Sequence, residues 1–194
     1  MKSMATKMSV YVGILVIVIC SLLGIISYQR GANEVKDEIS EALRLIAQEG
    51  SRYLEATFER ELAVLQTVAE RTELKGMNWE EQHPTIASEE KRLSQFLALG
   101  VVDRSGLARY ADGSTANLGD RPYVIDALAG KWAVSDLIVS RVTNGLVLMY
   151  AVPIRDNGQV VGALIARGDG MMLSEITDTL GFSENGWAYI MNGA

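Results

Sequence analysis

Residues 132–167 read WAVSDLIVSRVTNGLVLMYAVPIRDNGQVVGALIAR, which is a series of short apolar runs separated by two turn signals. Both turn signals, Asn144-Gly145 and Asn157-Gly158, contain the Asn-Gly pair that readily adopts the positive φ angles of hairpin turns. The apolar runs are short and rich in β-branched residues, as expected of strands. The stretch predicts a three-stranded antiparallel meander with strands at 132–140, 146–154 and 159–167.

Two further short strands are predicted before the meander, at 97–102 and 107–110. The sequence Asp103-Arg104-Ser105-Gly106 joins them as a turn ending in glycine, and residues 114–119 form a polar loop. A short helix follows from Asp120 to Leu128: Asp120 is placed to cap it, Pro122 suits its first turn and Gly130 ends it. After the meander we expect a helix over 171–180 and a strand over 186–191.

A long amphipathic helix is predicted from Asn33 to Leu74, because this region has no proline, one glycine and apolar residues three or four apart. The apolar stripe comprises Val35, Ile39, Ala42, Ile46, Leu54, Phe58, Leu62, Leu65 and Ala69. Such a stripe is either the seam of a homodimer or the face that packs on the chain's own domain. Residues 75–90 break the pattern and predict a loop, followed by a short helix at 88–95.

Residues 8–29 carry no charge and are long enough to cross a bilayer as a helix. A cleaved signal peptide has a shorter apolar core and a small-residue cleavage site, which the exit at 26–30 does not offer, so a retained anchor is favoured. Lys2 and Lys7 favour a cytoplasmic N-terminus, although basic residues also follow the span. We therefore expect residues 1–7 to form a cytoplasmic tail, residues 8–29 a transmembrane helix and residues 30–75 a long extracytoplasmic helix. An extracytoplasmic domain follows.

The composition excludes several classes of function. The formal net charge of −6 argues against nucleic acid as a partner, because phosphate binding needs a basic face. The single cysteine, Cys20, lies in the apolar span, so no intramolecular disulfide forms. His83 is the single histidine and stands in a polar stretch, which favours surface placement over metal binding or catalysis. We expect no enzyme activity, no metal and no cofactor, since the sequence offers neither a nucleophile–base pair nor a phosphate loop.

Several segments together resemble the double Cache sensor region of bacterial methyl-accepting chemotaxis proteins. The segments that carry the resemblance are Leu97–Asp103, Asp112–Tyr123, Ala129–Lys131, Ser135–Asp136, Ala151–Ile154 and Gly158–Leu164. The resemblance implies an α+β fold, a PAS-like antiparallel sheet flanked by helices, with residues 76–185 as the membrane-distal Cache subdomain. Residues 186–194 would then begin a second subdomain. It also implies a non-catalytic chemoreceptor that faces outward from the bacterial inner membrane.

In that family the outer half-domain holds a small ligand between its sheet and the loop and helix that bear the Asp-Arg motif. The resemblance implies that Arg121 meets a ligand carboxylate through its guanidinium and that Tyr123 supplies a wall with a hydroxyl. It implies that Asp169 meets an ammonium group. Ser140 and Tyr110 complete the residues that we expect to contact the ligand.

The residues by themselves leave a plainer reading open. Arg121 with Asp120 also fits a surface pair plus a helix cap, and Asp169-Gly170 also fits a simple turn. The amino-acid-binding members carry an aromatic pair after the motif arginine and a Tyr-x-Asp after Ser-Asp, whereas this chain has Pro122-Tyr123-Val124 and then Ile138 and Ser140 at those places. This departure counts against a generic amino acid. The expected ligand is an organic acid or an amino-acid-like molecule, with another small anion or an indirect ligand carried by a binding protein as alternatives.

The resemblance implies partners beyond the ligand: the membrane, a second copy through the long helix, and cytoplasmic signalling proteins reached through a region beyond Ala194. We therefore expect the chain to be the N-terminal fragment of a longer receptor. Sensor histidine kinases and diguanylate cyclases use the same module, so the output stays open. A membrane-anchored binding or scaffold protein is the remaining alternative.

Overall fold

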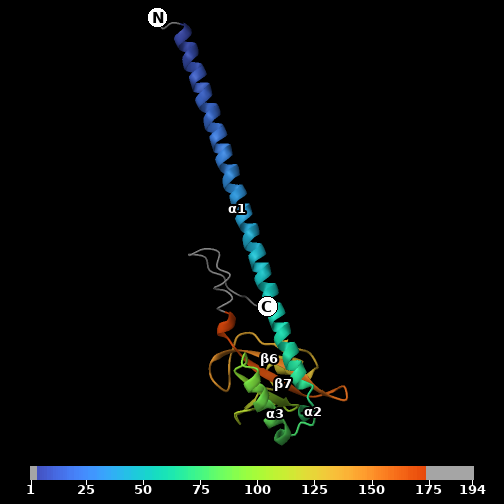
Figure 1. Cartoon of the computed structure of the whole chain (residues 1–194). Helices are drawn as coiled ribbons and strands as arrows, with labels where there is room; N and C mark the ends of the chain where they lie inside the picture. Colours follow the sequence, from blue (N-terminus) through green and yellow to red (C-terminus); the bar gives the residue numbers. More distant parts are fainter. Residues whose placement is uncertain (1–3, 174–194) are drawn as a thin grey trace. The chain divides into compact units, whose positions relative to one another are not determined.

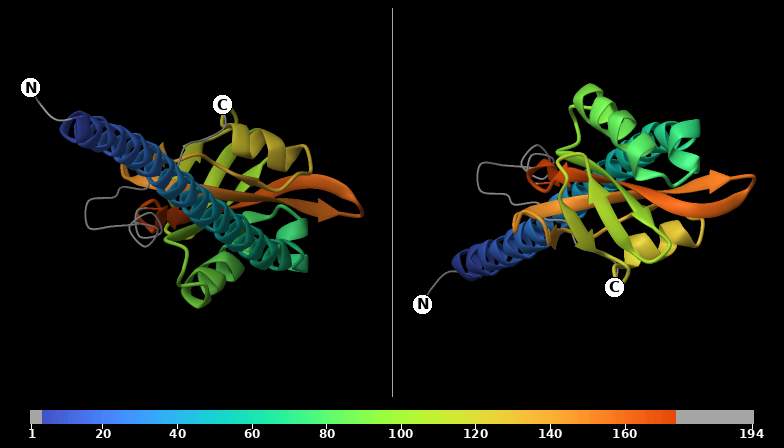
Figure 2. Two further views of the ribbon diagram at one scale, coloured as in Figure 1. Left: turned by 90° about the horizontal axis from the view of Figure 1, so that it is seen from above. Right: turned by 90° about the horizontal axis from the view of Figure 1, so that it is seen from below.

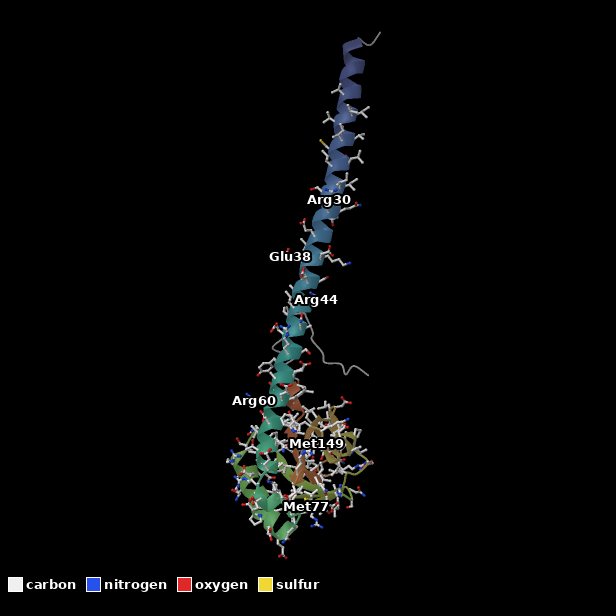
Figure 3. The ribbon with its side chains drawn as sticks, turned by 90° about the vertical axis from the view of Figure 1, so that its right-hand side faces the viewer. Arg30, Glu38, Arg44, Arg60, Met77 and Met149 are labelled. Atoms are coloured by element: carbon white, nitrogen blue, oxygen red, sulfur yellow. The ribbon has the colours of Figure 1, made fainter. Side chains whose placement is uncertain are left out.

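The computed structural model describes residues 4–173 of the chain, which divides into two compact units at Glu49 and Gly50. The first unit is formed by the N-terminal part of helix α1 (Met4–Ala69). This helix contains an 18-residue window with a mean hydropathy of 2.3, none of which is buried. The charged side chains of Arg30, Glu38 and Arg44 follow further along the same helix (Figure 3). By length and composition, α1 could therefore cross a membrane.

The second unit contains the end of α1 and an antiparallel sheet of seven strands, so the predicted α+β class is confirmed (Figure 1). The sheet order is β3-β2-β1-β7-β6-β4, and β5 also pairs with β6. After α1 the helices are α2 (Thr72–Lys75), α3 (Trp79–Arg92) and α4 (Pro122–Leu128). The strands are β1 (Ala98–Asp103), β2 (Leu107–Tyr110), β3 (Thr115–Asn117), β4 (Ala133–Val134), β5 (Ile138–Val139), β6 (Leu146–Asp156) and β7 (Gln159–Asp169).

The predicted hairpin of the last two strands is confirmed. Strands β6 and β7 pair from Val147↔Asp169 to Asp156↔Gln159, and their turn has φ angles of 48° at Asn157 and 81° at Gly158. The single strand predicted over 132–140 is wrong, because this segment forms two short strands, β4 and β5. Ser135 follows β4 and interrupts the pairing. Its N–H donates to the Met149 carbonyl at 2.8 Å, but the Met149 N–H donates to the Ser135 hydroxyl at 2.9 Å and not to a backbone carbonyl, and that hydroxyl donates to the carbonyl of Asp136.

The sheet is covered on both faces (Figure 2). On one face the end of α1 packs with α2 and α3, and the buried residues there include Leu62, Leu65 and Ile86. On the other face α4 packs over β6 and β7, with Tyr123 and Val124 buried against the strands. We call this second side of the sheet the α4 face.

The C-terminal half of the apolar stripe on α1 packs on its own domain. Leu62, Leu65 and Ala69 are at most 6% exposed, whereas Val35 and Ile39 in the first unit are 56% and 43% exposed. The predicted helix also ends earlier than Leu74, since α1 stops at Ala69 and α2 resumes after a short break. Intramolecular packing therefore accounts for the stripe in the second unit only.

Two local predictions before the meander are wrong. Helix α3 starts at Trp79 where a loop was expected, because the Asn78 side chain caps it by accepting the Glu80 N–H, and Gln82, Ile86 and Glu89 are buried along one side. Pro84 is tolerated inside this helix at an exposed position. Residues 115–117, expected in a polar loop, form the edge strand β3 on β2. The predicted helix over 171–180 lies mostly, and the strand over 186–191 wholly, outside the described residues.

Candidate ligand-binding cavity

A cavity of about 190 Å³ lies between the start of α4 and the segment that carries β4 and β5. It combines a guanidinium, two carboxylates, two hydroxyl-bearing side chains and several apolar groups. The lining residues are Arg121, Pro122, Tyr123, Asp126, Ala133, Val134, Ser135, Asp136 and Ile138. A concave site with a few polar groups among apolar ones is typical of small-molecule binding.

Arg121 occupies the N-cap position of α4 with an extended backbone, at φ −81° and ψ 129°. The prediction that Asp120 caps this helix is wrong, because its two carboxylate oxygens accept hydrogen bonds from Arg141 at 2.7 and 2.6 Å. That pairing holds the pKa of Asp120 below its usual value. The Nε atom of Arg121 is buried and has no hydrogen-bond partner. A cationic group next to the cavity is thus left with an unused donor.

Tyr123 lines the cavity, and only 4% of its surface is exposed. It packs on the α4 face with Tyr110 and Met149. Burial raises the pKa of Tyr123 to about 12, so its hydroxyl stays protonated and is available as a donor over the physiological range.

The other predicted site residues do not line this cavity. Ser140 is buried, and its hydroxyl accepts the N–H groups of Val142 and Thr143 at 3.2 Å. Asp169 is exposed and accepts the N–H of Met171 at 2.9 Å. Tyr110 is 2% exposed and lies within the packed α4 face. Their ligand contacts stay predictions, and the structure brings together only Arg121 and Tyr123.

Sequence reasoning missed the opposite wall of the cavity. In the sequence, Ser135 and Asp136 stand out only through the resemblance, and Asp126 belongs to none of the segments that carry it. Asp126 stands four residues after Pro122, a spacing that places both on one side of α4 and that could have indicated Asp126 as a wall residue.

Among the described residues, no group of three or more His, Cys, Asp or Glu side chains is placed to hold a metal. His83 lies half-buried, with Nε2 3.0 Å from the Ala111 carbonyl oxygen.

Two buried tyrosines predict a loss of stability at high pH. Burial raises the pKa of Tyr123 and of Tyr150 to about 12, above the value of 10.0 for an unperturbed tyrosine. A group with a raised folded-state pKa contributes stability that is present below the unfolded pKa and is lost as the pH rises through the folded one. The unfolding free energy should therefore fall between about pH 10 and pH 12, which urea titrations at successive pH values would measure.

Substitution by phenylalanine provides the test of that assignment. Tyr123→Phe and Tyr150→Phe should each reduce the alkaline fall, whereas the same change at Tyr53, which is 62% exposed, should leave it as it is. An equally steep fall in all three variants would assign the alkaline loss to other groups.

The chain is similar to known proteins in its three-dimensional structure. No model of a protein family matches the chain, and no curated protein matches it. The ligand-binding domain of Mlp24 with asparagine is similar at 19% identity and a TM-score of 0.61, over 76% of this chain and 64% of that one. The ligand-binding domain of the Pseudomonas fluorescens chemoreceptor CtaA with L-alanine is similar at 14% identity and a TM-score of 0.58, over 68% and 60%.

A third similar structure is the extracellular domain of the putative histidine kinase rpHK1S-Z16, at 17% identity and a TM-score of 0.54, over 66% of this chain and 56% of that one. The chain therefore spans less than two-thirds of the length of each of these structures. The chain shares its fold with these extracellular and ligand-binding domains, two of which are named as ligand-binding domains, one of them from a chemoreceptor.

Proposed function

We propose that this chain is the extracytoplasmic small-ligand sensor of a transmembrane chemoreceptor, acting by binding and not by catalysis. The observation that carries the proposal is the cavity at the start of α4, where Arg121 presents a buried Nε without a partner. The fold supports it, since the similar domains of Mlp24 and CtaA hold asparagine and L-alanine. The size of the cavity, about 190 Å³, suits a small metabolite, being below the volume typical of drug-sized ligands.

The proposed ligand is an organic acid or an amino-acid-like molecule with a carboxylate at Arg121. A guanidinium matches a carboxylate through two parallel hydrogen bonds, and such charge-assisted bonds are strong away from water. Asp126 and Asp136 on the cavity wall provide the opposite charge that an amino group would need. Tyr123 adds a hydroxyl and an apolar ring.

The apolar part of α1 supports an anchor in the bacterial inner membrane, with the sheet-bearing unit outside the cell membrane. Lys2 and Lys7, before the span, support a cytoplasmic N-terminus. The exposed Val35 and Ile39 supply an apolar surface for a homodimer through the long helix. In this proposal the signal reaches cytoplasmic partners through a region that follows Ala194.

A direct contact joins the cavity wall to α1. Trp132 immediately precedes the cavity residues Ala133 and Val134, and its indole Nε1–H donates to Gln66 Oε1 on α1 at 3.0 Å. If the wall has two arrangements, a ligand that binds one of them better shifts the equilibrium toward that arrangement. The size of the shift is limited by the difference in the ligand's affinity for the two. The Trp132–Gln66 bond is the route by which we propose that this shift reaches α1.

Arg121→Ala tests the binding site. The substitution removes a charge-assisted hydrogen bond to the ligand, so the apparent affinity should fall on the order of 10- to 100-fold while the fold stays intact. The full chain in lipid nanodiscs would be heated with L-asparagine, L-alanine, acetate or succinate, and unfolding followed by tryptophan fluorescence. The exposed turn residue Arg104, changed to alanine, is the matched control.

Ligand-induced stabilisation should disappear in Arg121→Ala and persist in Arg104→Ala. Equal stabilisation in both variants would remove Arg121 from the site. Failure of a broad panel of amino acids and organic acids to stabilise the unaltered chain would contradict the sensor itself.

A sensor histidine kinase is the second candidate, because the extracellular domain of rpHK1S-Z16 shares the fold. The two candidates agree on the sensing step and differ in output. Autophosphorylation of the complete receptor with ATP would favour the kinase, whereas methylation of its cytoplasmic region would favour the chemoreceptor.

A further inference from the structure

Arg167, on β7, is a buried cation with two unpaired donor atoms. Its residue surface is 6% exposed, and its Nε and Nη2 atoms are shielded from solvent and make no hydrogen bond. Arginine keeps its charge in proteins, and burying an unpaired charge is unfavourable. Among the described residues, Arg121 is the only other one with a buried side-chain nitrogen that lacks a partner.

Arg167 belongs to the α4 face, the same side of the sheet as Tyr123. Its direct neighbours in register are Ala98 on β1 and Met149 on β6, both of which pack in the cluster beneath α4. Met149 lies within the sheet-bearing unit (Figure 3). Its backbone carbonyl accepts the N–H of Ser135, a residue of the cavity wall. Strand β6 thus lies between β7, which carries Arg167, and β4, which carries part of this wall.

The nearest aromatic ring accounts for part of the environment of Arg167. Its Cζ atom lies 5.2 Å from the centroid of the Tyr110 ring, a cation–π arrangement. That ring lies against Gly100, where an added Cβ would come within 2.9 Å of Tyr110 Cδ1. The absence of a side chain at Gly100 therefore makes room for Tyr110. The Tyr110 ring and hydroxyl interact with the guanidinium, but the Nε and Nη2 atoms of Arg167 remain without acceptors.

No carboxylate of the described residues compensates Arg167. Hydrogen bonds from Ser114 lower the pKa of Asp112, and the positive charge of Arg167 contributes to lowering it. Asp112 is nevertheless exposed, and its Oδ1 accepts those hydrogen bonds from the N–H and the hydroxyl of Ser114. Asp169, two residues along the strand, is exposed and accepts the Met171 N–H. The Nε and Nη2 donors of Arg167 are consequently without acceptors among the described residues, and an anionic ligand group would supply them.

We propose that Arg167 is a second anion-binding residue of the sensor, and that its ligands are small organic acids with two carboxylates, one for Arg121 and one for Arg167. The inference rests on the proposed sensor function and deepens it. Two guanidiniums with unused donors come from different elements, the N-cap of α4 and β7. A ligand with one carboxylate and one ammonium satisfies only one of them.

Arg167→Met gives a readout that needs no ligand. Methionine keeps much of the apolar volume and removes the buried charge, so the variant should unfold at a higher temperature than the unaltered chain when no organic anion is present. Arg104→Met, at an exposed position, should leave the unfolding temperature unchanged. A structural role for Arg167 would instead lower the unfolding temperature, and that result overturns the proposal.

The second measurement uses oxalate, malonate, succinate and glutarate on the full chain in nanodiscs, with sodium chloride at matched ionic strength as the control. At least one of these diacids should stabilise the unaltered chain, and Arg167→Met should weaken its apparent affinity on the order of 10- to 100-fold. Arg167→Lys should restore part of it. Equal stabilisation of the unaltered chain and Arg167→Met overturns the inference.

The amino acids, the diacids and the chloride control together distinguish a failure of this inference from a failure of the sensor proposal. Stabilisation by L-alanine or L-asparagine but by no diacid overturns the diacid inference and leaves the sensor standing. Stabilisation by chloride alone, or by no compound, overturns both.

Discussion

The double variant Arg71→Ala, Arg92→Ala is expected to lose about 3 kcal/mol of unfolding free energy. Both arginines pair with Glu89 on α3, whose side chain is only 3% exposed. Removing them leaves a buried carboxylate without compensation, which is among the costlier single defects in a protein core. The estimate stays at the lower end of the range because the arginine side chains are themselves 46% and 59% exposed. Urea unfolding of the full chain, followed by tryptophan fluorescence, would measure it.

The same cluster predicts an asymmetry between its members. Glu89→Leu removes the buried charge and leaves two arginines that water can solvate, so it should cost about 1 kcal/mol or less. Adding Glu89→Leu to the double variant should recover most of the lost stability. If Glu89→Leu is as damaging as the double arginine variant, the penalty comes from lost packing at this site and not from an unpaired charge.

The sequence predicts the hairpin of β6 and β7 well because its signals are local. Asn157 and Gly158 have the positive φ angles that an Asn-Gly hairpin requires, and the flanking runs are apolar since both faces of the sheet are covered. The part of α3 before Ser88 is not predicted, because its stabilising contacts are tertiary. Gln82 donates to the Leu74 carbonyl at 2.9 Å and Glu89 pairs with Arg71, and neither contact is visible in a polar segment that contains Pro84.

The residues of the candidate site likewise fall into those that local sequence predicts and those that only tertiary structure brings together. Arg121 and Tyr123 stand in one short motif at the start of α4, so a local resemblance was sufficient to find them. The facing wall is brought there by the pairing of β4 and β5 with β6, a register that the sequence does not state. Arg167 was read simply as the end of an apolar strand, since a charge at a strand end is usually solvated. Only the structure reveals that it is buried and that its Nε and Nη2 atoms lack acceptors.

Gly106→Ala is expected to destabilise the sheet-bearing unit by about 3 kcal/mol, more than a strained turn alone explains. Gly106 has a φ of +88°, and a Cβ there would lie 2.4 Å from Gly119 Cα and 2.7 Å from Gly119 N. Both atoms belong to the backbone, so no side-chain rotation relieves the clash. The Gly106 carbonyl also accepts the Leu118 N–H at 2.8 Å, which holds the β1–β2 turn against the segment leading to Arg121.

Gly113 offers a matched control, because it has a similar φ of +82° and nothing within 4 Å of an added Cβ. Gly113→Ala should therefore cost about 1 kcal/mol, the strain of the left-handed backbone alone, and the difference between the variants measures the close approach. Equal losses of unfolding free energy in the two variants would mean that the backbone around Gly119 moves away from the added Cβ at no cost. A larger loss in Gly106→Ala, accompanied by weaker ligand stabilisation, would show that this turn positions Arg121, since the clash displaces the backbone that presents it.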